Sequence, residues 1–174
     1  INNPRIKSAW DKLPLKTSFR ITHQMAAFVN HVMLSSSADE ETIVATKNGA
    51  KVKYVICNSF GFAPAKVLRN LLANGTYKPS DVFVIAPSVR SKLNPIKRLE
   101  NRMVEAGIAC FVPVADDEIL NPNVINGKMV FSTFHQTKGL ERKIVMVFGF
   151  DESYFKFFNR DANPEICPNE LYVA

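Results

Sequence analysis

The chain has 174 residues, of which 47% are hydrophobic, enough for one domain with a substantial core. Lys and Arg outnumber Asp and Glu by 22 to 16, and the resulting net charge of +6 suits a polyanionic partner without identifying one. The three cysteines, Cys57, Cys110 and Cys167, are far apart and lack CxxC spacing. This argues against a zinc site or a disulfide framework and favours the reduced thiols of an intracellular protein. No apolar run has transmembrane length, so no membrane partner is expected.

The first half of the chain predicts alternating helices and strands. Apolar residues at helical spacing indicate a helix over residues 21–34. A β-branched and aromatic run predicts a strand over residues 51–60. Pro64 is expected to open a helix that Gly75 ends. The near-continuous apolar run at residues 81–89 is typical of a strand covered on both faces.

The second half continues this alternation. Residues 94–107 predict a helix with Asn94 as N-cap and Gly107 at its end. Three further strands are expected, over residues 108–114, 128–133 and 143–150. Residues 151–170 predict a long aromatic and acidic loop before a final helix that starts at Pro168. Helices between buried strands favour an α/β three-layer domain with a mainly parallel sheet.

A cluster of polar residues separates the last two apolar runs. Residues 132–138 follow a predicted strand, and ligands of parallel sheets gather at the carboxyl ends of strands. Phosphate-binding loops use glycine and backbone N–H groups with a Lys or Arg for charge. Lys138 and Gly139 fit that chemistry weakly, but GxxxxGK[ST] does not occur in the chain. A nucleotide is therefore expected to be bound only in part by this domain.

Four segments of the chain carry a resemblance: STFHQTKGLE, the terminal NELYVA, KTSFRIT, and the stretch from APSVR to IACF. Together they resemble motifs of superfamily 1 helicases of the UvrD, Rep and PcrA type. STFHQTKGLE is similar to their T-x-H-x-x-K-G-L-E motif, and the terminal NELYVA resembles the start of Y-V-A-x-T-R. KTSFRIT is similar to N-[YF]-R-S-T, with Ser18 in place of Asn and Ile21 in place of Ser. The segment from APSVR to IACF resembles the family's strand, polar turn, L-E helix and second strand. The four occur in the family's order, and the resemblance implies that residues 1–174 are the second RecA-like domain of a DNA helicase.

The resemblance implies nucleotide-binding roles for four residues. Phe19 matches the aromatic that stacks on adenine; the alternative is a core phenylalanine. Arg20 matches the arginine that reaches the γ-phosphate, where a planar cation stabilises the transition state. The alternative is a surface arginine at a helix start, where the positive end of the dipole disfavours a cation. Glu141 matches the carboxylate that accepts from the ribose, against a surface ion pair with Arg142 or Lys143, and Gly139 is placed at the nucleotide.

The same resemblance places part of the chain against single-stranded DNA. A hydroxyl and a neutral imidazole can hydrogen-bond to phosphate oxygens. Gln136 and Lys138 are expected to couple the DNA-facing and nucleotide-facing ends of the segment. His23 and His31 are interpreted as ordinary helix-surface residues. The DNA-facing residues are Thr133, His135, Ser88 and Arg90.

The resulting hypothesis is an ATP-dependent DNA helicase or translocase. Its partners are single-stranded DNA and a first RecA-like domain of the same protein, which is expected to supply the phosphate loop and the ligands of the magnesium that accompanies ATP; no metal ligand is assigned in this chain. The ends of the sequence look cut, so a fragment without ATPase activity of its own is expected. The interval between Arg20 and Thr133 is too short for the large inserted subdomain of many relatives. Two alternatives stay open, a non-catalytic nucleic-acid-binding module and an RNA-directed superfamily 1 helicase.

Overall fold

The computed structural model describes residues 16–34, 42–56, 63–90, 95–149 and 151–168. The chain divides into two compact units, residues 1–54 and residues 55–174, and each is described by itself. The prediction of a single domain over residues 1–174 stays a prediction.

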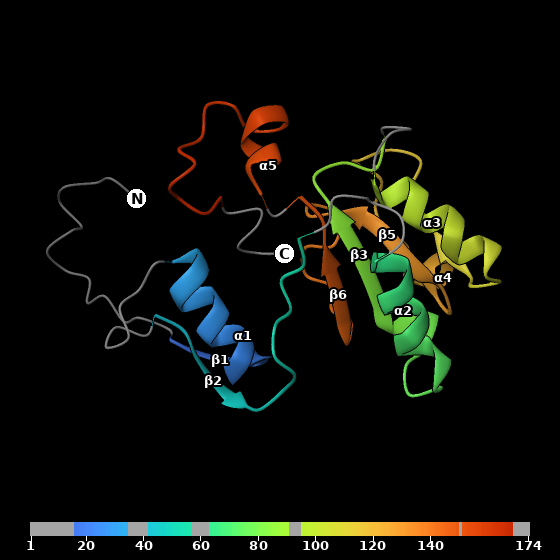
Figure 1. The fold of residues 1–174 in the computed structure, drawn as a ribbon, viewed down its shortest axis with the longest axis horizontal. Coiled ribbons are helices and arrows are strands. Elements are labelled where there is room, and N and C mark those ends of the chain that lie inside the picture. The colour runs from blue at the N-terminus through green and yellow to red at the C-terminus, as the bar shows by residue number, and fades with distance from the viewer. Residues whose placement is uncertain (1–15, 35–41, 57–62, 91–94, 150, 169–174) are drawn as a thin grey trace, which may run out of the picture. The chain divides into compact units, whose positions relative to one another are not determined.

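The first unit is a parallel strand pair joined by a helix (Figure 1). Strand β1 (Thr17–Thr22) leads into α1 (His23–Phe28), which continues as the π-helical turn η1 (Val29–Met33), and β2 (Val44–Lys47) pairs with β1. Thr22 is the N-cap, since its hydroxyl accepts from the backbone N–H of Met25 at 3.3 Å. The helix predicted from residue 21 thus starts two residues later.

A buried asparagine joins the helix to the second strand. Asn30 is 1% exposed, and its amide donates to the Ile43 carbonyl at 2.8 Å and accepts from the Ile43 N–H at 3.0 Å. Because both polar ends of the amide are satisfied, its burial carries little penalty. The apolar periodicity that predicted this helix gave no signal for the tether.

The strand predicted over residues 51–60 is wrong where the structure describes it. Residues 51–56 have no regular structure and are exposed, and residues 57–60 lie outside the described part. The strand in this region is β2, earlier in the chain. Strand propensity measures how well side chains fit a pleated, half-buried surface, and Tyr54, Val55 and Ile56 occupy no such surface, with exposures of 58%, 59% and 85%.

The second unit contains a four-stranded, all-parallel sheet in the order β4-β5-β3-β6 (Figure 1). This confirms the predicted α/β class with a parallel sheet flanked by helices, which is compatible with a three-layer RecA-like fold. Its elements, in chain order, are α2 (Ala63–Ala73), η2 (Pro79–Asp81), β3 (Val82–Ala86), α3 (Pro95–Glu105), β4 (Cys110–Phe111), α4 (Pro122–Ile125), β5 (Met129–Thr133), β6 (Ile144–Val147) and α5 (Glu152–Phe157).

Helices α2 and α3 cover one face of this sheet. Their apolar residues, including Leu68, Ile96 and Leu99, pack in one cluster with alternate residues of β3 and β5, and these three are 0% exposed. Every residue of β3 and β5 is buried, so both faces of these two central strands are covered. This explains why their sequences read as continuous apolar runs. Both helices end close to the glycines that were predicted to end them, and Gly75 and Gly107 have φ of +71° and +75°.

Two expectations for the second half need correction. Strand β4 covers only two residues of the predicted 108–114. The segment 151–170, predicted as a loop, begins with helix α5, because the Asp151 carboxylate caps it by accepting from the Ser153 N–H at 2.8 Å. Residues 158–168 are irregular, as predicted, and the residues after Pro168 lie outside the described part.

Candidate functional site at the carboxyl edge of the sheet

Three loops leave the same edge of the sheet. Residues 88–90 follow β3, residues 114–118 follow β4, and residues 134–139 follow β5. The three strands are neighbours and parallel, so their carboxyl ends meet at one edge. This is where open parallel sheets bind ligands. The structure therefore brings the predicted residues Ser88, Arg90, Thr133 and His135 to a common edge.

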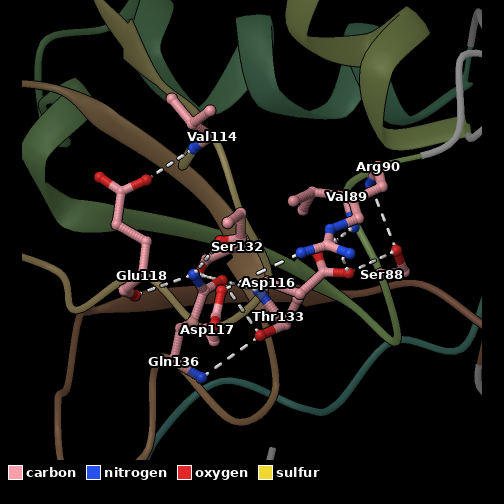
Figure 2. Close-up of polar contacts among 11 residues, drawn as sticks. Ser88, Val89, Arg90, Val114, Asp116, Asp117, Glu118, Ser132, Thr133 and Gln136 are labelled. Atoms are coloured by element: carbon pink, nitrogen blue, oxygen red, sulfur yellow. Dashed lines mark hydrogen bonds and ion pairs between the residues drawn. The ribbon is translucent and has the colours of Figure 1, made fainter.

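Gln136 organises the turn after β5 (Figure 2). Its Oε1 accepts from the Ser132 hydroxyl at 2.8 Å and from the Thr133 hydroxyl and N–H at 3.0 and 3.1 Å. Its Nε2 donates to the carbonyls of Ala115 and Glu118 at 2.8 and 2.9 Å. Both amide hydrogens are used on carbonyls, which can only accept, so the orientation of the amide is fixed. One side chain thus joins the end of β5 to the 114–118 loop.

Asp116 joins the same loop to the end of β3. Its carboxylate accepts from the Ser88 hydroxyl at 3.1 Å and from the Val89 N–H at 3.2 Å, and it lies 3.4 Å from Arg90 Nε (Figure 2). A second carboxylate, Asp117, lies 4.0 Å from Arg90 Nη2. Ser88 Oγ also accepts from the Arg90 N–H at 3.2 Å. The donors of residues 88–90 thus converge on a carboxylate of the protein itself.

The turn after β5 buries its first residue and exposes later ones. Thr133 is 1% exposed, and its hydroxyl donates to Gln136 Oε1 and accepts from the Gln136 N–H at 3.3 Å. A phosphate contact from this hydroxyl requires the turn to open. His135 and Lys138 are exposed. Gly139 has φ of +85° with open space beside its α-carbon, so glycine is needed there for the backbone conformation.

Glu141 lies on the return path to the opposite edge. The chain has to regain the amino edge before β6 begins at Ile144, and Glu141 is exposed on that segment. Arg142 beside it turns to backbone carbonyls, with its shortest bond to Lys128, and Lys143 pairs with Asp81 at 3.1 Å. Both cations named in the ion-pair alternative for Glu141 thus have other partners. One end of the motif, Thr133, thus ends β5 at the carboxyl edge, and the other end, Glu141, directly precedes the arginine that bonds at the amino edge.

Arg142 fixes the amino edge of the sheet. Its guanidinium donates to four carbonyls and lies 4.5 Å from the ring centre of Phe83. Burial lowers the pKa of Arg142, and the nearby Asp81 carboxylate opposes this effect. A planar fork with several donors suits this arrangement. The carbonyls belong to Lys128 at 2.6 Å, Val82 at 3.0 Å, Ile125 at 3.3 Å and Pro79 at 3.5 Å.

Phe19 and Arg20 lie in the first unit, on strand β1. The Phe19 side chain is 76% exposed, so it does not belong to the core of the first unit. Arg20 is exposed and precedes the N-cap, so the argument that a cation is unfavourable at a helix start does not apply to it. His23 and His31 are exposed on the helix that follows, as predicted.

Sequence reasoning missed Asp116. Residues 114–118 carry no motif, and the partners of Asp116, Val89 and Ser88, are 27 and 28 residues away in the chain. The only signal was its place after a strand of a parallel sheet, which predicts a ligand-side loop but not its contacts. Gln136 was predicted as a coupling residue between DNA and nucleotide, which stays a prediction; its side chain joins the end of β5 to the 114–118 loop.

Neither a metal site nor a membrane span is found in the part of the chain that the structure describes. There, no three His, Cys, Asp or Glu side chains are grouped so that they could hold a metal ion. None of the helices described is long and apolar enough to cross a membrane.

Comparison with known proteins gives no match. No family model matches the chain, and no curated protein or solved structure is significantly similar to it. The helicase resemblance therefore rests on the sequence motifs alone.

Proposed function

We propose that this chain is the second RecA-like domain of an ATP-dependent DNA helicase or translocase of superfamily 1. The observation that carries the proposal is the position of the T-x-H-x-x-K-G-L-E segment. Its first half forms a hydrogen-bonded turn at the carboxyl edge of a parallel sheet, beside the loops that follow the two neighbouring strands. In open α/β sheets this edge is the ligand-binding edge.

Single-stranded DNA is the proposed ligand of this edge. His135 and Lys138 are exposed on the turn, and Ser88 and Arg90 lie in a neighbouring loop. An imidazole, an ammonium, a hydroxyl and a guanidinium are all groups that bind phosphate oxygens. Thr133 contributes through the turn that it forms with Gln136.

ATP is the proposed nucleotide, bound between this domain and a first RecA-like domain. An exposed Phe19 suits stacking on adenine, and an exposed Arg20 suits a reach across a cleft to the γ-phosphate. Glu141 is the candidate for the ribose contact, with Gly139 shaping the backbone of the same segment. Magnesium is assigned to the phosphates and to the first domain.

The direct test is ATP hydrolysis by the full-length protein with and without an oligo(dT) strand. We expect turnover that the DNA strand stimulates, and no turnover by the 174-residue chain alone. Stimulation by oligo(U) but not oligo(dT) would make the protein RNA-directed. Strand binding without turnover would make it a non-catalytic binding module.

Arg20 tests the composite ATP site. In the full-length protein, Arg20→Ala is expected to lower kcat by about 100-fold or more while ATP binds within about tenfold of wild type, because such arginines act on charge that develops in the transition state. Arg20→Lys should restore little, since an ammonium lacks the planar fork. Normal turnover in Arg20→Ala, with the fold intact, contradicts the role.

A further inference from the structure

Residues 88–90 form an anion-binding turn that is filled by a carboxylate of the protein. A hydroxyl from Ser88, the backbone N–H of Val89 and the guanidinium of Arg90 all face Asp116. A convergent set of hydroxyl, amide and guanidinium donors is the chemistry that binds a phosphate. In this structure Asp116 takes the place that a phosphate oxygen would take.

We propose that Asp116 competes with a strand phosphate for residues 88–90. The inference rests on the proposed function and adds a regulatory contact to it. Asp116 has to leave Ser88 and Arg90 before both can turn to a phosphate of single-stranded DNA. The carboxylate therefore lowers the affinity for single-stranded DNA, because the strand phosphate has to displace it.

The contact is weak enough to exchange. The side chains of Arg90 and Asp116 are 62% and 31% exposed. Ion pairs at such exposure contribute little to stability, because water screens them. A phosphodiester of the strand carries the same single negative charge and the same number of charged oxygens as the carboxylate, so it can replace Asp116 once the rest of the strand is bound.

The neighbouring loop holds Asp116 at this position. Gln136 binds the carbonyls of Ala115 and Glu118, which flank Asp116 on both sides. The carboxylate is thus presented to the β3 side by a loop that is anchored on the β5 side (Figure 2). Displacing Asp116 pulls on the loop that Gln136 holds, which links strand binding at residues 88–90 to the turn that carries His135.

Competition and simple support predict opposite results. If Asp116 only keeps residues 88–90 in shape, its loss weakens strand binding. If it competes with phosphate, its loss tightens strand binding. Asp116→Asn separates the two, because the amide oxygen can still accept from the Val89 N–H while the negative charge is removed.

The experiment measures oligo(dT) binding to the full-length protein by fluorescence anisotropy over a series of salt concentrations. Asp116→Asn is expected to bind about three- to tenfold more tightly. Its plot of log K against log salt should be steeper by about 0.7, the slope of one added phosphate contact on a single strand. The matched control is Asp117→Asn, which removes the same charge from a residue 91% exposed and 4.0 Å from Arg90, and should change affinity less than twofold.

The tighter oligo(dT) binding of Asp116→Asn must also depend on residues 88–90. In an Arg90→Ala background, Asp116→Asn should no longer tighten binding, and a gain that persists there overturns the proposal in favour of a general charge effect. Equal or weaker binding by folded Asp116→Asn overturns it as well. If wild type and variant both fail to bind oligo(dT) at low salt, both the proposed function and the competition are contradicted. If wild type binds and Asp116→Asn binds no more tightly, only the competition by Asp116 is contradicted.

Discussion

The two edges of the central sheet are each tied by planar side chains, but in different ways. At the amino edge Arg142 spends its guanidinium on four backbone carbonyls and the face of Phe83. At the carboxyl edge Gln136 and Asp116 join three loops, while His135 and Lys138 stay exposed beside them.

We interpret the amino edge as a structural clamp formed by Arg142, and the exposed part of the carboxyl edge as the proposed binding surface. The carbonyls at the amino edge lie where β3 and β5 begin or in the segments just before them, and a cation there stabilises the fold. At the carboxyl edge the pair of Asp116 and Arg90 is partly exposed, so it can rearrange at small cost, whereas Gln136 holds the buried end of β5 in place. Loops on a rigid scaffold are where binding residues concentrate. We therefore expect substitutions at the amino edge to affect stability, and those at the exposed part of the carboxyl edge to affect binding.

The largest expected effect on folding is at Arg142. Arg142→Met removes the guanidinium donor from four carbonyls, of which those of Pro79 and Ile125 keep a backbone N–H as a further donor. We expect the free energy of unfolding to fall by about 2–4 kcal/mol. Urea unfolding of the 174-residue chain measures this. Lys143→Met is the matched control, since it removes the same charge from a side chain that is 66% exposed and leaves Asp81 its bond from the Lys78 N–H, and it should cost less than about 1 kcal/mol. Equal losses in the two variants would contradict the clamp.

Gln136→Ala should cost less. It removes the acceptor of the Ser132 and Thr133 hydroxyls and the side-chain donor to two loop carbonyls, of which that of Ala115 keeps the Glu118 N–H. We expect the free energy of unfolding to fall by about 1–3 kcal/mol. Hydrogen exchange should be faster at the amides of Thr133 and Gln136, which bond within this turn. Gln136→Glu keeps the acceptor but cannot donate to the carbonyls, so it should restore only part of the loss. Full stability in Gln136→Ala would show that the loops are held by other contacts.

The contrast between the edges was only partly predictable from sequence. The strands β3, β5 and β6 followed from apolar runs, and Gly75 and Gly107 marked the helix ends, because these signals are local. The high strand propensity of residues 51–56 led to a wrong strand prediction, because these residues are exposed and do not pack on a sheet.

The site was predictable where a motif carried it and not elsewhere. His135 and Gln136 stood in a recognisable segment. Asp116 and Arg142 did not, because a carboxylate near Ser88 and a guanidinium on distant carbonyls depend on tertiary contacts spanning from 14 to 63 residues. Asn30 was missed for the same reason.

At the exposed part of the carboxyl edge, His135→Ala is expected to leave stability unchanged within about 0.5 kcal/mol, because the side chain contributes little to the core. In the full-length protein it should weaken oligo(dT) binding or the DNA stimulation of ATPase by about three- to tenfold, with basal ATP binding intact. The loss of one phosphate hydrogen bond accounts for this size. An unchanged DNA response would return His135 to an ordinary surface residue.

The smallest expected effect is on the pH dependence of stability, through the thiol of Cys110 on β4. Burial, and then the Glu100 carboxylate, raise the pKa of the Cys110 thiol from 9.0 to about 11. The folded chain keeps this proton where the unfolded chain loses it, so stability should decline as the pH rises from about 9 to 11. Burial is partial, so the decline should be slight. Cys110→Ala should remove it, and iodoacetamide should label native Cys110 slowly at pH 8. Rapid labelling of the native protein would contradict the raised pKa.

The most direct measurement is hydrogen exchange of the full-length protein with and without oligo(dT), followed by mass spectrometry of its peptides. The account predicts that the strand slows exchange in residues 134–139 and changes it in residues 88–90 and 114–118, while residues 125–128 and 142–143 at the amino edge stay the same. Protection confined to the amino edge, or strand binding with no change in any of the three carboxyl-edge loops, would contradict the claim that this edge binds DNA.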